Sequence, residues 1–447
     1  MAGMPLLHAF FLFAAVIIIV GATWKGLHPF FAIVIAAVAF AAACGFSISF
    51  LGKTFGNGFS PMLYSPGLVI VAAAFVGGIA ESTATNRLTA GIAPLRAWLG
   101  STRIVSLLGL IAGIAASPAS AFAVLTPLLP SLAGKTQRAP AAVALALSIS
   151  ASHGLLLISP VPIAAMAILG ADWHRVALFG IPAAILVIAL SAAWVRWLPM
   201  AEDASQPITR GSDAVSDKRS GGATTVLVVA TAIPLALLMV QSIGDMPTEP
   251  LGGASRRELI LGGGRPLILL VVGVGIMVAG QWQKARSLLT DAGWSGRILG
   301  NVAGVLLIVG AAAGLQALCH ETGMAELLGE RLLGWHAAGP AGLLVPFLIA
   351  AAIKTLQGSS MVAAITAAGM VQPILQSLGL GDDTALAALA VGAGAMTASH
   401  VNDDYFWLVS ATAGFSPLRG LVTVTLGTLV QGLVAVAALL VLAALGI

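Results

Sequence analysis

The order of apolar and polar stretches along this chain occurs twice, once in each half. Each half opens with three long hydrophobic segments, at about residues 6–22, 28–46 and 63–80 and then at about 223–243, 265–281 and 299–318. Each half continues with a weakly amphipathic stretch, two short helical segments around a polar break, a helix ending in Ser-Ala-Ser-His or Thr-Ala-Ser-His, an irregular loop and a long final segment. Segments of about 20 apolar residues can cross a bilayer as helices, so the pattern predicts many spans in two similar halves.

The composition places this pattern in a lipid bilayer. Of 447 residues, 59% are hydrophobic and only 9% are charged, whereas a soluble domain carries about 25% charged residues. Continuous runs of Leu, Val, Ile and Ala favour helices over the alternating strands of an outer-membrane barrel. The sequence therefore predicts an all-α polytopic membrane protein with room for ten or more spans.

The net charge, the two cysteines and the N-terminal segment limit the possible partners and sites. The net charge of +4 does not indicate a nucleic-acid partner, because Lys and Arg in loops mostly record membrane orientation. Cys44 and Cys319 show no disulfide framework or metal spacing. The first 25 residues lack a basic leader and a clear cleavage site, so we expect a first span and no signal peptide.

Matching residues in the same order, at spacings that differ only by a small insertion, support a duplication. The matches are Glu81-Ser82 with Glu321-Thr322 and SAFAVLT (120–126) with SMVAAIT (360–366), both 240 apart, and His153 with His400, 247 apart. Five spans per half is an odd number, so the second half is expected to be inverted in the membrane. We predict a first repeat at 1–198, a polar cytoplasmic linker at 199–222 and a second repeat at 223–447.

Two polar breaks divide helices that are too short to span. AASPASA (115–121) and TLQGSSM (355–361) separate segments of about 13–16 residues, which at 1.5 Å per residue fall short of about 30 Å. We predict re-entrant hairpins at about 104–133 and 340–377, followed by broken helices at about 139–172 and 384–412. Paired interrupted helices in corresponding halves indicate a transporter binding site.

The distribution of basic residues predicts the orientation. With five spans per half, the side that holds the linker collects 14 of the 21 Lys and Arg residues, and the other side collects seven. The positive-inside rule then places the linker and the first hairpin in the cytoplasm and both termini outside.

Polar residues at the breaks are the candidate site, because an ionisable group near the bilayer centre needs a partner or a wet cavity. The expected substrate-binding residues are Ser117, Ser120, His153, Ser159, Lys354, Gln357, Gly358, Ser359, Ser360, His400 and Asn402. The expected proton-coupling residues are His153, His400 and Asp403, and no metal site is expected. The ends of the broken helices would offer amides to an anionic substrate and carbonyls to a small cation.

Several of these residues also have a structural interpretation. His153 could bridge backbone carbonyls at a helix break instead of carrying a proton. Lys354 could meet a substrate carboxylate or extend to the membrane surface. Asp404 is expected to cap a helix start, and Glu81 and Glu321 to close spans at an interface.

At these positions the chain resembles the gluconate permease family of proton-coupled symporters. The resemblance runs from about residue 55 to the C-terminus, and it is carried by SHVNDDYFWLV (399–409), QGSSMVAAITAAGMVQPIL (357–375) and HGLLLISPVPIAAMAILGADW (153–173). The family is similar to the larger ion-transporter group, in which re-entrant hairpins pair with broken helices. The resemblance implies an elevator mechanism in which the hairpin domain carries substrate past a fixed scaffold.

The chain departs from the family pattern in the first half. Leu157 and Ile158 stand where a double proline is usual, and Ser159 replaces a second histidine. Ala119 stands where the family tends to carry an acidic residue, and Lys354 replaces an arginine, which loses a bidentate grip on a carboxylate. The resemblance therefore implies an organic, hydroxylated acid more securely than gluconate itself.

The expected function is proton-coupled uptake of gluconate or a related sugar acid through the bacterial cytoplasmic membrane. Sodium is the alternative coupling ion, and a membrane-embedded acyl-transfer or hydrolytic enzyme that uses His400 and Asp403 is the alternative class. No phosphate loop, zinc motif or nucleotide fold is present in the sequence, so we expect no cofactor and no ATP-driven pump. By analogy with elevator scaffolds we expect a homo-oligomer, with a dimer as its form.

Overall fold

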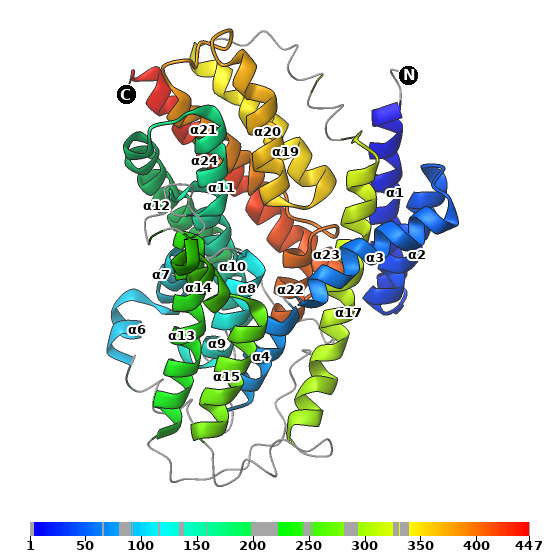
Figure 1. Ribbon diagram of the computed structural model, residues 1–447, viewed down its shortest axis with the longest axis vertical. Coiled ribbons are helices and arrows are strands. Elements are labelled where there is room, and N and C mark those ends of the chain that lie inside the picture. Colours follow the sequence, from blue (N-terminus) through cyan, green and yellow to red (C-terminus); the bar gives the residue numbers. More distant parts are fainter. Residues whose placement is uncertain are drawn as a thin grey trace.

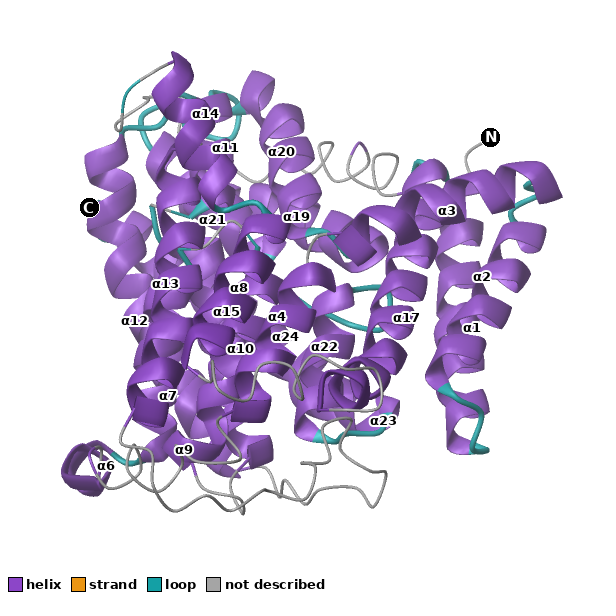
Figure 2. Ribbon diagram, turned by 60° about the horizontal axis from the view of Figure 1, so that its bottom comes forward, coloured by secondary structure: helices purple, strands orange, loops and turns teal. Residues whose placement is uncertain are grey.

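The computed structural model is built from helices throughout the residues that it describes (Figures 1 and 2). These residues are 4–64, 67–79, 91, 93–114, 117–133, 138–157, 159–197, 222–244, 252, 254–280, 294–324, 330 and 339–446. The helices before the linker are α1 (Met4–Trp24), α2 (Pro29–Ala43), α3 (Ile48–Tyr64), α4 (Gly67–Ile79), α6 (Ala93–Leu99), α7 (Ser101–Ala112), α8 (Pro118–Leu125), α9 (Leu129–Ala133), α10 (Arg138–Leu155), α11 (Pro160–Leu169) and α12 (Trp173–Trp197).

The helices after the linker complete the fold. They are α13 (Gly222–Gly244), α14 (Ala254–Gly263), α15 (Pro266–Gly280), α17 (Trp294–Glu321), α19 (Leu344–Gln357), α20 (Ser360–Val371), α21 (Thr384–Ala395), α22 (Asp404–Ala413), α23 (Pro417–Gly420) and α24 (Leu426–Ala444). Residues 199–221 of the predicted linker, Glu81 and Ile158 lie outside the described residues.

Long apolar helices make the chain a multi-pass membrane protein. In the described part of the chain, seven helical stretches are long and apolar enough to cross a membrane, or nine if each of two bent pairs forms one span. The seven are Leu7–Trp24, Ile48–Phe75, Arg138–Leu169, Trp173–Trp197, Ile298–Glu321, Gly339–Gln357 and Pro417–Ala444. The prediction of about five spans per half is larger because it counted short apolar helices such as α2, which has 15 residues.

Two helices were not predicted. The sequence analysis placed a span at 63–80, whereas the structure has α3 at Ile48–Tyr64 before α4. This segment includes Lys53, Asn57 and six serine, threonine or glycine residues, so it lacks a continuous hydrophobic run. The second is α14, whose first turn includes Arg256 and Arg257.

The helices α2 and α3 pack against α17 at one side of the molecule, and α1 packs against α2 (Figure 1). Glycines on α17 allow close contact, since a Cβ atom added at Gly310 or Gly314 would overlap the ring of Phe59 or Phe55. Small residues of this kind let membrane helices approach each other when no water-driven force brings them together.

Broken helix pairs form the interior of the fold. In the first half, α7 and α8 flank one break and α10 and α11 flank the next; in the second half, α19 and α20 flank one break and α21 and α22 flank the next. Prolines or serines begin α8, α11 and α20, because a hydroxyl can cap a helix start and proline fits its first turn. Gly358 ends α19 in a left-handed conformation, with φ of 79°.

The helix α19 has 14 residues, which agrees with the predicted length of about 13–16. A 3-10 turn at Gly339–Leu343, which was not predicted, precedes it and makes a continuous helical stretch of 19 residues, Gly339–Gln357. This stretch is long enough to cross the membrane by length, whereas α20 has only 12 residues.

Candidate functional site

A cavity of about 180 Å³ lies where the four helix breaks meet. Its polar lining comes from both halves of the chain and consists of Ser117, Ser150, His153, Gln316, Lys354, Ser359, Ser360, Ser399, Asp403, Asp404 and Tyr405. Three methionines, Met62, Met361 and Met396, add an apolar and flexible part of the wall. The cavity therefore combines charged, hydroxyl and apolar surfaces in one small volume.

Three helices begin at this cavity. Ser117 caps α8 by accepting the amide hydrogen of Ser120, with a distance of 3.3 Å between the two heavy atoms. Ser359 caps α20 in the same way through the amide of Val362, also at 3.3 Å. Asp403 begins α22 and accepts from the amide of Tyr405 at 3.0 Å. Because helix N-termini carry partial positive charge, their convergence favours an anionic group in the cavity.

A buried ion pair joins the second hairpin to the second broken helix. The Nζ atom of Lys354 lies 2.5 Å from Oδ2 of Asp403, and both side chains are only 4% exposed. The same ammonium donates to the backbone oxygen of Gly358 at 2.5 Å. Lys354 therefore points into the protein and does not extend to the membrane surface, so the second interpretation of this residue is wrong, and its contact with a substrate carboxylate stays a prediction.

Ser399 is a second partner of Asp403 that the sequence analysis missed. Its hydroxyl donates to Oδ2 of Asp403 at 2.5 Å. Its backbone is held by the last helix, because its amide donates to Oγ1 of Thr428 at 3.0 Å and its carbonyl accepts from Oγ1 of Thr425 at 2.6 Å. A π-helical turn at Leu421–Thr425 precedes α24 and is the kind of local irregularity that often occurs at functional sites.

The two histidines of the repeated motif bind carbonyls at equivalent places. His400 Nε2 lies 2.7 Å from the oxygen of Thr355, near the end of α19, and His153 Nδ1 lies 3.4 Å from the oxygen of Gly113, at the end of α7. A carbonyl only accepts, so each of these ring nitrogens carries the hydrogen. His153 lines the cavity, whereas His400 lies behind its wall.

Asn402 also serves the end of α19. Its side-chain amide donates to the backbone oxygens of Thr355 and Leu356 at 3.0 and 3.2 Å. Asn402 is fully buried and does not line the cavity. The last carbonyls of a helix have no partners within the helix. Here the side chains of His400 and Asn402 provide hydrogen-bond donors for carbonyls at the end of α19. The irregular loop after α21 is thus fastened to the hairpin by two of its own side chains.

The remaining predicted site residues divide between wall and interior. Gly358 lines the cavity, and a side chain there would overlap the backbone of Asn402. Ser120, Ser159 and Gln357 are buried but do not line the cavity. The Ser159 hydroxyl lies 3.0 Å from the oxygens of both Gly113 and Ser152, so it closes the first broken helix against α7.

One predicted cap was wrong. Asp404 was expected to cap a helix start, but its neighbour Asp403 is the cap of α22 and Asp404 is the first residue of the helix itself, facing the cavity. Glu321, the last residue of α17, is exposed at the end of its span.

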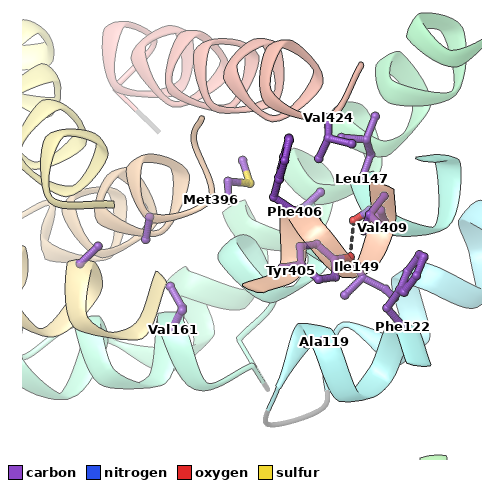
Figure 3. Packing of buried hydrophobic residues seen from close by; sticks show 14 of the residues in the cluster. Ala119, Phe122, Leu147, Ile149, Val161, Met396, Tyr405, Phe406, Val409 and Val424 are labelled. Carbon is purple, nitrogen blue, oxygen red and sulfur yellow. Dashed lines mark hydrogen bonds between the residues drawn. The ribbon is translucent and has the colours of Figure 1, made fainter. Parts of the chain in front are cut away.

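Tyr405 links the start of α22 to the first half of the chain. Its hydroxyl donates to the oxygen of Ala146 at 2.9 Å, and its ring meets Phe122 edge-on with centroids 5.9 Å apart. Figure 3 shows Tyr405 beside Ala119 and Phe122 of α8 and near Met396. Aromatic packing of this kind fixes the position of Asp403 and Asp404 relative to the first hairpin.

The chain is similar in sequence to several known transporters. The gluconate permease of Pseudomonas aeruginosa is 28% identical over 425 residues, covering 90% of each chain. The D-serine transporter DsdX of Escherichia coli is 25% identical over 419 residues, covering 92% of each chain. The antimetabolite efflux pump MtrF of Neisseria gonorrhoeae covers 88% of this chain and 82% of its own at 17% identity, but its TM-score of 0.36 is too low to carry an inference.

The family model for GntP permeases matches residues 4–445, which is nearly the whole chain. Permeases move solutes and do not catalyse reactions, so the alternative of an acyl-transfer or hydrolytic enzyme is excluded. The chain belongs to the GntP permease family and is a membrane transporter.

Proposed function

We propose that this protein takes up gluconate or a related small hydroxylated carboxylate by proton symport. The observation that carries the proposal is the buried Lys354 ammonium in a cavity where three helices begin. A cation together with helix N-termini is the usual means of binding a carboxylate away from water. The serine hydroxyls around it, Ser117, Ser359, Ser360 and Ser399, can bond the hydroxyl groups of such a substrate.

The names of the relatives support a class of substrate more than one compound. Some are named gluconate permeases or transporters, and others are named D-serine transporters. Gluconate and D-serine share a carboxylate and at least one hydroxyl, and a Lys354 cavity lined by serines suits both.

Protons are the proposed coupling ion. Asp403 and His153 both line the cavity, and a carboxylate or an imidazole there can take up and release a proton as a substrate binds. His400 lies behind the wall and bonds a backbone oxygen, so its proposed part is to hold the site together. Sodium remains the competing ion.

We further propose inverted repeats, an elevator mechanism and a homo-oligomer in the bacterial inner membrane. The equivalent contacts of His153 with α7 and of His400 with α19 support the repeats. Arg175 donates to the oxygen of Asp382 at 2.8 Å, and under the inverted topology the first turn of α12 and the loop that holds Asp382 share the outer side. A relative named inner membrane permease supports the location.

Uptake by purified protein in liposomes tests the function. Labelled gluconate should accumulate when the outside is made acidic, and a protonophore should abolish this accumulation. Unlabelled D-serine and other hydroxy acids, added in excess, would rank the substrates by competition. Accumulation that follows a sodium gradient and ignores the protonophore would replace the proton with sodium, and an absence of uptake of all these acids would refute the proposal.

A further inference from the structure

The ion pair of Lys354 and Asp403 stands in the place where a substrate carboxylate would have to bind. Both residues line the cavity, and their charged atoms are 2.5 Å apart. A lysine ammonium has three hydrogens to donate, and two of them have partners in Asp403 and the oxygen of Gly358. The cation that is best placed for a substrate is therefore already bound to a carboxylate of the protein.

Adding the carboxylate of a substrate to this ion pair is unfavourable unless a negative charge is removed. Asp404 also lines the cavity, so a bound substrate anion would bring three carboxyl groups around one ammonium. Carboxylates that share one buried site cannot all remain ionised, and one of them takes up a proton. A buried carboxylate that loses its cation is neutralised in the same way.

We propose that Asp403 is an internal substitute for the substrate carboxylate, and that substrate binding transfers Lys354 from Asp403 to the substrate while Asp403 takes up one proton. The inference rests on the proposed function, which it deepens by naming the exchange that couples proton to substrate. Charge balances in this step, because one anion and one proton enter together. Release on the other side reverses it: Asp403 loses the proton and binds Lys354 again.

The hydrogen bonds around Asp403 are compatible with both of its states. Oδ1 accepts from the amide of Tyr405 whether or not the acid is protonated. Oδ2 accepts from the hydroxyl of Ser399 when it is charged. A hydroxyl can also accept, so a proton on Oδ2 can be donated to Ser399 after the hydroxyl turns. No other change of partner is needed once Lys354 has moved to the substrate.

The groups that face Asp403 explain why the exchange is assigned to this residue. In the described part of the chain these are Lys354 of α19, Ser399 and His400 of the loop, Asp404 and Tyr405 of α22, and His153 and Gln316 across the cavity. Among them only Asp403 forms an ion pair with Lys354, and only its release is linked to occupation of that ammonium by a substrate. Asp404 adds negative charge to the site and so strengthens the need for a proton.

Calorimetric titration of the purified protein with gluconate, in buffers of different ionisation enthalpy, measures the protons taken up on binding. The wild type should take up about one proton per gluconate, and its affinity should weaken about tenfold for each unit of rising pH above the titration of the free site. Asp403→Asn should bind gluconate without proton uptake, because an amide can still cap α22 but cannot be protonated. It should also keep gluconate counterflow while losing accumulation driven by a pH gradient.

A matched variant makes the result specific to Asp403. Asp382→Asn carries the same substitution on an exposed loop and should keep the proton uptake of the wild type. Retention of proton uptake in Asp403→Asn would overturn the exchange.

An independent measurement uses the wild type alone, in case Asp403→Asn does not fold. Infrared difference spectra should show a new protonated carboxyl band when gluconate is added. A wild type that binds gluconate with neither a band nor proton uptake would overturn the exchange and leave the proposed transport of the acid intact. A wild type that binds no sugar acid, hydroxy acid or D-serine would overturn the proposed function and the exchange with it.

Discussion

Gly154 and Gly392 contact each other through their backbones where the first broken helix crosses the second. A Cβ atom at Gly154 would lie 2.9 Å from the oxygen of Gly392, and one at Gly392 would overlap the oxygen of Gly154. The contact places the end of α10 directly against α21, so that the breaks in the two helices face one cavity. The small residues of VGAGAM (391–396) thus have a packing role, as close helix contact in membranes requires.

Gly392→Ala should therefore destabilise the protein by about 1–3 kcal/mol, since added volume in a packed interior forces the backbone apart. The clash is with a backbone atom and cannot be relieved by turning a side chain. Thermal unfolding of the purified protein in detergent measures the effect. Gly275→Ala is the matched control: it lies within α15, has no atom within 4 Å of the added Cβ, and should leave stability unchanged or raise it through helix propensity. Equal melting temperatures for the two variants would contradict the crossing.

Thr428→Val should loosen the loop that bears Asp403. Valine keeps the shape of threonine but removes the oxygen that accepts from the amide of Ser399, and a buried amide without a partner costs about 1–3 kcal/mol. Thr428→Ser retains the oxygen and should recover most of the lost stability. Melting temperatures and initial uptake rates of both variants check this expectation, and a serine variant no better than the valine variant would show that the hydroxyl is unimportant.

Asp172 predicts a pH dependence of stability outside the membrane. Its carboxylate caps α12 by accepting from the amide of Arg175 at 3.0 Å, and this bond, with His174 nearby, lowers the pKa of Asp172 below its ordinary value. A lowered folded pKa means stabilisation that is complete above the unfolded pKa of about 3.9 and is lost as the pH falls through the folded value. Asp172→Asn still caps the helix but has no charge, so its melting temperature should fall less steeply with acid. Parallel curves for the two proteins would contradict this contribution.

Much of the fold could be predicted because the breaks have local causes. Ser117 with Pro118, and Gly358 with Ser359, end or begin helices through their own chemistry, so the sequence indicates where the hairpins turn. The helix α3 was not predicted, because its polar residues and glycines interrupt the continuous apolar run that identifies a membrane span. The 3-10 turn before α19 was not predicted, because it lengthens the helical stretch without a change in composition.

The candidate site could be predicted only in part because its contacts join distant residues. Lys354 and Asp403 were both candidates, but they are 49 positions apart and nothing in the sequence pairs them. Thr428 and Ser399 are 29 positions apart, and a threonine within an apolar helix resembles any other. In the loop after α21 no helical period exists, so the sequence cannot tell which of His400, Asn402 and Asp403 faces the cavity. Only the three-dimensional arrangement separates Asp403 from the two residues that fasten α19.

The inverted topology predicts on which side of the membrane two regions lie, the linker and the contact of Arg175 with Asp382. The contact of Arg175 with Asp382 and Asp383 joins the first turn of α12 to the loop before α21, and five spans per half would place both of them outside. The linker at 199–222 would lie in the cytoplasm, where positive charge accumulates. Single cysteines can report these positions once Cys44 and Cys319 are replaced by alanine.

In that background, Asp382→Cys should react with a membrane-impermeant maleimide in intact cells, whereas Ser216→Cys in the linker should react only after the inner membrane is opened. Asp382 is exposed, so its thiol would be accessible without unfolding. Ser101→Cys, at the start of the first hairpin, should follow the linker if that hairpin enters from the cytoplasm. Labelling of Asp382→Cys and Ser101→Cys from the same side would mean that the two hairpins enter from one face, and it would exclude an inverted repeat.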